Sequence, residues 1–260
     1  MSAWSNPWPR QSGCARRPVI GVLCCNEFSQ RPVQAVATRF VQPLADVAGA
    51  AVVLIPAVSD ACDALALVDR LDGLLLTGSR SNVAATRYGA IRDDNGPVDE
   101  QRDEVALRLA AHMIEGARPV FGICRGLQEL NVLFGGTLTD GLDSVHHCGL
   151  ADGTHYDRHF DHRHDLTLTP GGMLQAQAGV AAETVNSVHH QGIDRLGHGL
   201  TVEATAAEDG LIEAFSAQPC GADVLAVQWH PEWDIGTSQA SRAFFDRIGT
   251  ALATNVRTLS

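Results

Sequence analysis

A cysteine in this chain stands where nucleophilic catalysis on an acyl group would require one. Cys124 lies in the segment FGICRGLQEL, between Gly122 and Gly126. An apolar strand is predicted to end at Ile123 and a helix to begin directly after the cysteine. Glycines on both sides permit a tight and strained turn between them. Such a turn projects the thiol from the carboxyl edge of a sheet, and the helix N-terminus favours the nucleophilic thiolate.

A cysteine that ends a strand is more often a buried core residue than a catalytic one. An ordinary helix start does not need two flanking glycines, and each glycine costs conformational entropy on folding. The glycines and the change from strand to helix therefore favour the catalytic interpretation of Cys124. The same turn would leave the backbone N–H of Arg125 free to donate to an oxyanion.

A cysteine nucleophile needs a histidine that a third group orients. Among the eleven histidines, His230 stands directly after an apolar strand pattern, in the segment AVQWHPE. Pro231 biases the residue before it toward an extended backbone and prevents pairing through its own nitrogen. A rigid turn could then bring the Glu232 carboxylate to the imidazole. The alternative is a surface turn with an incidental histidine and glutamate; the cysteine turn earlier in the chain favours a triad.

The patterns around these residues predict the sheet that must position them. From Pro18 onward, short apolar runs alternate with longer segments of helical periodicity. Strands are predicted at 19–25, 52–55, 73–77 and 119–123, and helices at 34–49, 60–70, 99–115 and from 124 to about 135. Pro43 predicts a kink or an early end in the first helix. This alternation indicates βαβ units around a buried parallel sheet.

The second half of the chain has a different pattern. Residues 141–163 are polar and rich in histidine, and short alternating segments follow at 165–169, 184–188, 200–206 and 224–229. These segments predict further strands, some antiparallel, that complete the same sheet, and a last helix is predicted at 238–252. No linker or repeat divides the chain. We therefore expect one α/β domain over residues 18–255, preceded by a disordered extension at 1–17.

Composition narrows the classes of function. The net charge of −11 argues against general affinity for nucleic acid. All nineteen basic residues are arginine, which excludes a P-loop and any Schiff base on lysine. There is no apolar run long enough to span a membrane and no secretory signal pattern. The seven cysteines are irregularly spaced and include no CxxC pair. We therefore expect a cytoplasmic protein without disulfides.

The segments FGICRGLQEL and VLAVQWHPEW, in this order and separation, resemble the class I glutamine amidotransferases and their hydrolytic relatives of the peptidase C26 type. Three further segments, GSRSNVAATRYG, TVNSVHHQGI and VEATAAEDGLIEA, are similar to the γ-glutamyl-γ-aminobutyrate hydrolases. The resemblance covers residues 18–253. It implies a three-layer, flavodoxin-like sandwich in which helices flank a mostly parallel central sheet.

The resemblance also implies roles for individual residues. Cys124 would be the nucleophile, His230 the general base and acid, and Glu232 the residue that orients it. The oxyanion hole would combine the N–H of Arg125 with an N–H of the loop at Gly78. The implied contacts to the glutamyl group come from Gln128 and from the backbone around His189, His190 and Gln191. At the end of the strand before them, Asn186 and Ser187 either cap that strand or face the substrate.

The implied reaction is hydrolysis of a γ-glutamyl amide to glutamate and a free amine through a cysteine thioester, in the breakdown of polyamines such as putrescine. The resemblance does not decide whether the leaving amine is γ-aminobutyrate or a polyamine. One alternative is a glutaminase that supplies ammonia to a separate synthase. Another is a catalytically silent relative that only binds a ligand. The expected partner is a small γ-glutamyl amide, and a homodimer is left open.

A run of histidines and aspartates between residues 146 and 164 invites a metal-site interpretation. Its members are His146, His147, His155, Asp157, His159, Asp161, His162 and His164. Their spacing fits no common zinc pattern, and imidazoles in a polar loop are usually solvated. We therefore expect no metal and no cofactor.

Overall fold

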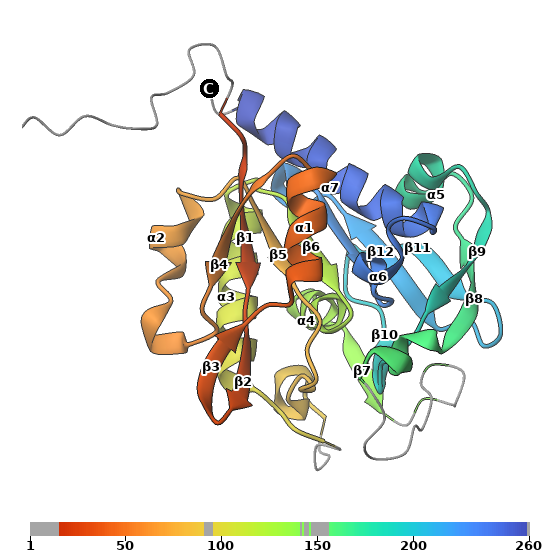
Figure 1. Cartoon of the computed structure of the whole chain (residues 1–260), viewed down its shortest axis with the longest axis horizontal. Coiled ribbons are helices and arrows are strands. Elements are labelled where there is room, and N and C mark those ends of the chain that lie inside the picture. Colours follow the sequence, from red (N-terminus) through yellow and green to blue (C-terminus); the bar gives the residue numbers. More distant parts are fainter. Residues whose placement is uncertain (1–15, 91–95, 141, 143–145, 147–155, 259–260) are drawn as a thin grey trace, which may run out of the picture.

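The computed structural model describes residues 16–90, 96–140, 142, 146 and 156–258. Its centre is a sheet of nine strands in the order β4-β1-β5-β6-β13-β12-β11-β8-β9 (Figure 1). The strands are β1 (Val19–Leu23), β4 (Ala51–Ile55), β5 (Gly73–Leu76), β6 (Val120–Ile123), β8 (Arg163–Leu168), β9 (Ala182–Asn186), β11 (Thr201–Ala206), β12 (Ile212–Ala217) and β13 (Val224–Val227).

The sheet is parallel in one half and antiparallel in the other. All neighbours from β4 to β13 in the sheet order pair in parallel. From β13 through β12, β11 and β8 to β9, every pairing is antiparallel. All residues of β5, β6 and β13 are buried, as expected for central strands that are covered on both faces. The predicted union of parallel and antiparallel strands in one sheet is confirmed.

Helices cover both faces of the sheet. The helices are α1 (Thr38–Asp46), α2 (Ala64–Val68), α3 (Glu100–Glu115), α4 (Arg125–Leu133), α5 (Met173–Ala178), α6 (Pro231–Asp234) and α7 (Gln239–Thr258). One hydrophobic cluster joins the sheet to α1, α5 and α7, and a second joins it to α2, α3 and α4. Leu75 belongs to the first cluster, whereas its neighbours Leu74 and Leu76 belong to the second. The three-layer α/β architecture is confirmed (Figure 1).

The segment after β1 differs from the prediction. The first strand ends at Leu23, and residues 25–35 form a hairpin of β2 (Cys25–Ser29) and β3 (Arg31–Ala35). Gln30, between the two strands, has a φ of 60°, which permits the tight reversal. The helix predicted from residue 34 therefore begins only at Thr38.

Several short elements were not predicted. Two strands, β7 (Thr137–Asp140) and β10 (Gln191–Arg195), form a separate antiparallel pair, and β12 and α5 were also missed. The helix predicted at 60–70 is interrupted because Asp63 leaves helical geometry and caps α2 by accepting from the Ala66 N–H at 3.1 Å. Local periodicity is weak in elements this short.

Most of the predicted N-terminal extension, residues 1–15, lies outside the described residues. Arg16 and Arg17 are described. The guanidinium of Arg16 forms an ion pair with Asp72 at 2.7 Å, and Arg17 donates to the carbonyl of Ala50 at 2.9 Å. Within the described part of the chain, no helix has both the length and the apolar character that crossing a bilayer requires.

Candidate active site

Cys124 occupies a strained turn between β6 and α4. Its backbone angles are φ 52° and ψ −104°, a region that residues other than glycine rarely enter. A β-carbon on Gly122 would lie 2.6 Å from the carbonyl carbon of Gly126, and one on Gly126 would collide with the backbone of Leu76. Both glycines are therefore required by close approach of the backbone. The predicted strand, tight turn and helix around the cysteine are confirmed.

The structure brings Cys124, His230 and Glu232 together. Ile123 is in register with Val227 across β6 and β13, so the two parallel strands carry Cys124 and His230 to the same edge of the sheet. The Nδ1 atom of His230 lies 2.7 Å from Oε1 of Glu232, and His230 and Cys124 line the same cavity. This is the spatial order of nucleophile, base and orienting carboxylate that thiol catalysis requires.

The charges around His230 favour its protonated form. Burial by itself would lower the pKa of His230, but the nearby Glu232 and Cys124 outweigh burial and hold this pKa well above its usual value of 6.5. A protonated imidazole beside the sulfur is the partner that a thiolate needs.

Asn186 holds the backbone of His230 from both sides. Its Nδ2 atom donates to the His230 carbonyl at 2.9 Å, and its Oδ1 atom accepts from the His230 N–H at 2.9 Å. The same amide group donates to Asp234 at 2.8 Å. Asn186 is fully buried, and it fixes the backbone of His230, the predicted base, from the interior of the protein. An asparagine at a strand end is too common a signal to have identified this partner.

The two predicted oxyanion donors lie beside the triad. Arg125 is the first residue of α4, so its N–H has no acceptor within the helix. Gly78 is buried against the predicted nucleophile and base: a β-carbon there would lie 2.6 Å from Cε1 of His230 and 3.5 Å from Cβ of Cys124. The backbone of the loop after β5 therefore lies next to the side chains of His230 and Cys124.

The side chain of Arg125 has a positioning role that sequence reasoning missed. Its guanidinium is buried and pairs with Asp103 of α3 at 2.6 Å and with Glu129 of α4. It also donates to the carbonyls of Ser81 at 2.9 Å and Asn82 at 3.1 Å. One side chain thus ties the loop that carries Gly78 to the helix that follows the nucleophile.

The triad opens into a cavity of about 790 Å³. Four of the predicted substrate-binding residues line it, namely Gln128, His189, His190 and Gln191. The amide of Gln128 donates to the Gln191 carbonyl at 2.7 Å and so fastens this loop to α4.

Ser187 is not brought to the cavity. It is fully buried, and its hydroxyl donates to the carbonyl of His146 at 2.7 Å. The side chain thus supports the chain behind the cavity wall, because its one hydroxyl proton is already used there. Its predicted contact with substrate has no counterpart in this geometry.

Charged and aromatic side chains also line the cavity. Arg39, Arg80 and Glu27 are among the lining residues. The guanidinium carbon of Arg39 lies 3.2 Å from the ring centroid of Trp233, and Trp233 stacks on Phe160 with a centroid distance of 3.9 Å. The guanidinium of Arg39 therefore lies on a stacked aromatic pair in the cavity wall.

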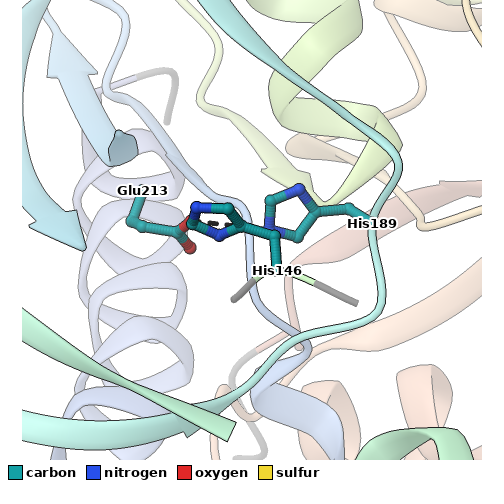
Figure 2. Close-up of side chains that lie close together, drawn as sticks. All are labelled: His146, His189 and Glu213. Atoms are coloured by element: carbon teal, nitrogen blue, oxygen red, sulfur yellow. Dashed lines mark ion pairs between the residues drawn. The ribbon is translucent and has the colours of Figure 1, made fainter. Parts of the chain in front are cut away.

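Two histidines of the polar segment are not solvated, contrary to expectation. His146 and His164 are buried, and together with His189 they surround the carboxylate of Glu213 on β12. Figure 2 shows His146, His189 and Glu213 turned toward one another. The prediction failed because β12, which carries the shared carboxylate, was not recognised. His147 and His155 lie outside the described residues.

Comparison of the sequence with known proteins identifies the family of this chain. A profile of the family described as Peptidase C26 matches residues 18–232. A γ-glutamyl-γ-aminobutyrate hydrolase of Escherichia coli K12 is 33% identical over 90% of this chain and 93% of its own length. A protein of Mycobacterium tuberculosis, described as a candidate glutamine amidotransferase, is 32% identical over 89% of this chain and 75% of its own length.

A solved structure supports the fold alone. A Thermoplasma acidophilum protein, described as a candidate component of GMP synthase, aligns with a TM-score of 0.63 over 94% of this chain and 99% of its own, at 19% identity. The likeness covers nearly the whole of both chains, so the layered architecture is shared despite the low identity.

Proposed function

This chain belongs to the Peptidase C26 family, and from that premise we propose that it is a hydrolase that cleaves γ-glutamyl amides through a thioester on Cys124. One observation carries the proposal. Cys124 sits in a strained turn at the sheet edge, beside an imidazole that Glu232 orients at 2.7 Å, and all three residues line one cavity. This combination suits acyl transfer, and a purely structural cysteine would not need it.

In the first half of the reaction, the Cys124 thiolate attacks the γ-carbonyl carbon. The negative charge that develops on the carbonyl oxygen is met by backbone N–H groups at Arg125 and Gly78. His230 transfers its proton to the departing nitrogen as the C–N bond breaks. The free amine leaves, and a γ-glutamyl thioester remains on Cys124.

In the second half, neutral His230 removes a proton from water as the water oxygen attacks the thioester carbon. The C–S bond then breaks, which releases glutamate and restores the thiolate and the imidazolium. Glu232 stays ionised throughout and stabilises the positive charge on His230. Gln128 and the loop at His189–Gln191 would hold the glutamyl group during both halves.

The charges of the cavity favour γ-glutamyl-γ-aminobutyrate as substrate. At neutral pH this molecule carries two carboxylates and one ammonium group. Outside the triad, the cavity lining includes two guanidinium groups, of Arg39 and Arg80, and one carboxylate, of Glu27. A γ-glutamylated polyamine would instead carry a second cation. The name of the E. coli relative supports the same choice of substrate. We propose with it a place in polyamine breakdown.

The test is to measure glutamate release from three substrates by purified wild-type protein and by Cys124→Ala. The substrates are γ-glutamyl-γ-aminobutyrate, γ-glutamylputrescine and glutamine. Cys220→Ala serves as a matched control, because Cys220 is exposed and does not line the cavity. We expect the γ-aminobutyrate conjugate to have the highest kcat/KM, and we expect no turnover in Cys124→Ala.

A direct readout of the intermediate completes this experiment. After acid quenching, mass spectrometry should find one γ-glutamyl acyl group on the peptide that contains Cys124. Preference for glutamine would instead support the ammonia-supplying alternative, which the M. tuberculosis relative represents by name. Glutamate release that persists in Cys124→Ala would rule out the proposed nucleophile.

A further inference from the structure

The carboxylate of Glu213 lies at the centre of a buried group of imidazoles. One of these, His189, lines the active-site cavity, whereas Glu213 lies behind it. Its Oε1 atom is 3.4 Å from Nε2 of His189 and 3.6 Å from Nδ1 of His146. Its Oε2 atom is 3.6 Å from Nε2 of His164. Glu213 is fully buried, and none of the three imidazoles is more than slightly exposed. None of these side chains takes part in the bond-making steps at Cys124.

The atoms that face one another in this group have no hydrogen-bond partner among the described residues. These atoms are Oε1 and Oε2 of Glu213, Nδ1 of His146, Nε2 of His164 and Nε2 of His189. A buried carboxylate without hydrogen bonds is costly, because burial removes its hydration. Among the described residues, either protons on the imidazoles or a bound cation should therefore compensate it.

In His146 and His189, the ring nitrogen that faces away from Glu213 (the outer nitrogen) determines whether the nitrogen that faces Glu213 (the inner nitrogen) carries a proton. Nε2 of His146 lies 2.7 Å from the Asp209 carboxylate, and Nδ1 of His189 lies 3.1 Å from the Gln191 carbonyl. Since both partners are acceptors, both outer nitrogens must carry the proton. In a neutral imidazole the inner nitrogen then presents a lone pair toward Oε1 of Glu213. Histidines that bind metals are oriented by such outer partners.

The distances from the inner nitrogens of His146 and His189 to Oε1 of Glu213 are those expected between ligand atoms of a single metal ion. Two donors at 2.0–2.1 Å from a tetrahedral ion lie about 3.3 Å apart. The two nitrogen-to-oxygen distances to Oε1 of Glu213, 3.4 and 3.6 Å, are close to that value and too long for good hydrogen bonds. One ligand atom from each of His146, His189 and Glu213 lies within 4.8 Å of the others.

We propose that Nδ1 of His146, Nε2 of His189 and Oε1 of Glu213 bind a divalent first-row transition ion. Two imidazoles and one carboxylate form known sites for both Zn²⁺ and Fe²⁺, and the ligand separations near 3.3 Å favour tetrahedral Zn²⁺. The expectation of no metal, drawn from the sequence, is thereby revised. His164 is not counted as a ligand, because it faces the other carboxylate oxygen.

The ion would connect the cavity wall to the sheet. His189 lines the active-site cavity, whereas Glu213 belongs to β12 inside the sheet. The bound ion would hold the loop at His189–Gln191 in place and would leave Cys124 untouched. Loss of the ion is therefore expected to raise KM for the amide substrate more than it lowers kcat.

The alternative is that protons alone compensate Glu213, so that one or more imidazoles are cationic. Metal binding by the full-length wild-type protein separates the two explanations. After treatment with EDTA and dialysis, the protein would be titrated with Co²⁺ and then with Zn²⁺. We expect one Co²⁺ per chain, with d–d absorption bands that Zn²⁺ abolishes. Fewer than about 0.1 ion per chain at saturation would overturn the proposal.

Variants locate the site. Glu213→Gln preserves shape and is expected to weaken Zn²⁺ binding by about 100-fold or more. Should that variant fold poorly, Asp209→Asn offers a second route, because Asp209 is partly exposed and, of the three proposed ligands, contacts His146. The expected loss of affinity for Asp209→Asn is about 10- to 100-fold. His112→Asn is the control, since His112 lies on α3 and pairs there with Glu115.

Thiol labelling makes this test independent of the proposed catalytic function. The rate at which iodoacetamide alkylates Cys124 should be the same in Glu213→Gln and in the wild type. Unchanged Zn²⁺ affinity in both Glu213→Gln and Asp209→Asn would refute the assigned ligands, whatever the activity of the enzyme.

Discussion

Gly78 packs directly against the imidazole of His230, with space for a hydrogen atom and not for a methyl group. A β-carbon at residue 78 would lie 2.6 Å from Cε1 of His230. The loop after β5 and the turn after β13 thus define each other's position at the reacting centre. The contact accounts for glycine at this position by close approach, since its φ is not in the left-handed region.

Gly78→Ala is therefore expected to lower kcat by about 10- to 100-fold, because either the imidazole or the oxyanion loop must move. Stability should change little. Steady-state kinetics and urea unfolding measure the two effects. Gly236→Ala is the control, because a β-carbon there meets no atom within 4 Å. Full activity in Gly78→Ala would show that this loop is not part of the catalytic centre.

Glu232→Gln is expected to change the pH profile as well as the rate. The raised pKa of His230 places the loss of the imidazolium proton, and with it the alkaline limb of kcat/KM, well above pH 6.5. Removing the carboxylate charge lowers that pKa, so the limb should move toward lower pH. The rate at the optimum should fall about 100-fold or more.

The pH dependence of the activity lost in Glu232→Gln distinguishes an electrostatic role of Glu232 from a general disruption of the active site. Without Glu232, burial lowers the pKa of His230, whereas at low enough pH the imidazole is protonated in both proteins, so the deficit of the variant should shrink as the pH falls from 8. A uniform loss of activity at every pH would contradict the electrostatic role assigned to Glu232.

Asn186→Ala is expected to lower kcat by about 10-fold or more with a smaller change in KM. The variant removes both hydrogen bonds to the backbone of His230, and the base loses its fixed orientation. Asn186→Asp should not recover the rate, because it places a buried carboxylate against Asp234 and the His230 carbonyl, to which Asn186 donates. An increase in KM alone would assign Asn186 to substrate binding instead.

Arg125→Met is expected to destabilise the protein by about 3–5 kcal/mol, because it leaves the buried carboxylates of Asp103 and Glu129 with less compensation. Urea unfolding measures the change. Arg108→Met is the matched control: its ion pair with Glu104 is exposed and 3.8 Å long, so its loss should cost less than about 1 kcal/mol. Equal destabilisation by both variants would contradict this account.

Arg39→Gln is expected to raise KM for γ-glutamyl-γ-aminobutyrate by about 10-fold and to leave the KM for glutamine nearly unchanged. The proposed reason is that Arg39 meets the second carboxylate, which glutamine lacks. Arg31→Gln, on the exposed hairpin, is the control. A parallel rise in both KM values would place the contribution of Arg39 at the glutamyl end.

The sequence was most informative where a short segment dictates its own geometry. Gly122 and Gly126 require a tight turn at Cys124 because larger residues would collide with the backbone, and both collisions are visible in the structure. His230 and Glu232 are two positions apart, so one local turn suffices to join them. Their meeting with Cys124 depends on the parallel pairing of β6 with β13, which carries both segments to one edge of the sheet.

The tertiary structure alone decided which distant residues share a buried charge. Arg125 was predicted for its backbone, yet its side chain joins Asp103, Glu129 and the loop after β5. His146 and His189 meet Glu213 only because β12 and the loops around it pack together behind the cavity. Such contacts depend on strand order and register across the whole sheet. Local pattern does not encode them, because the free energy that selects them arises from the packing of the complete chain.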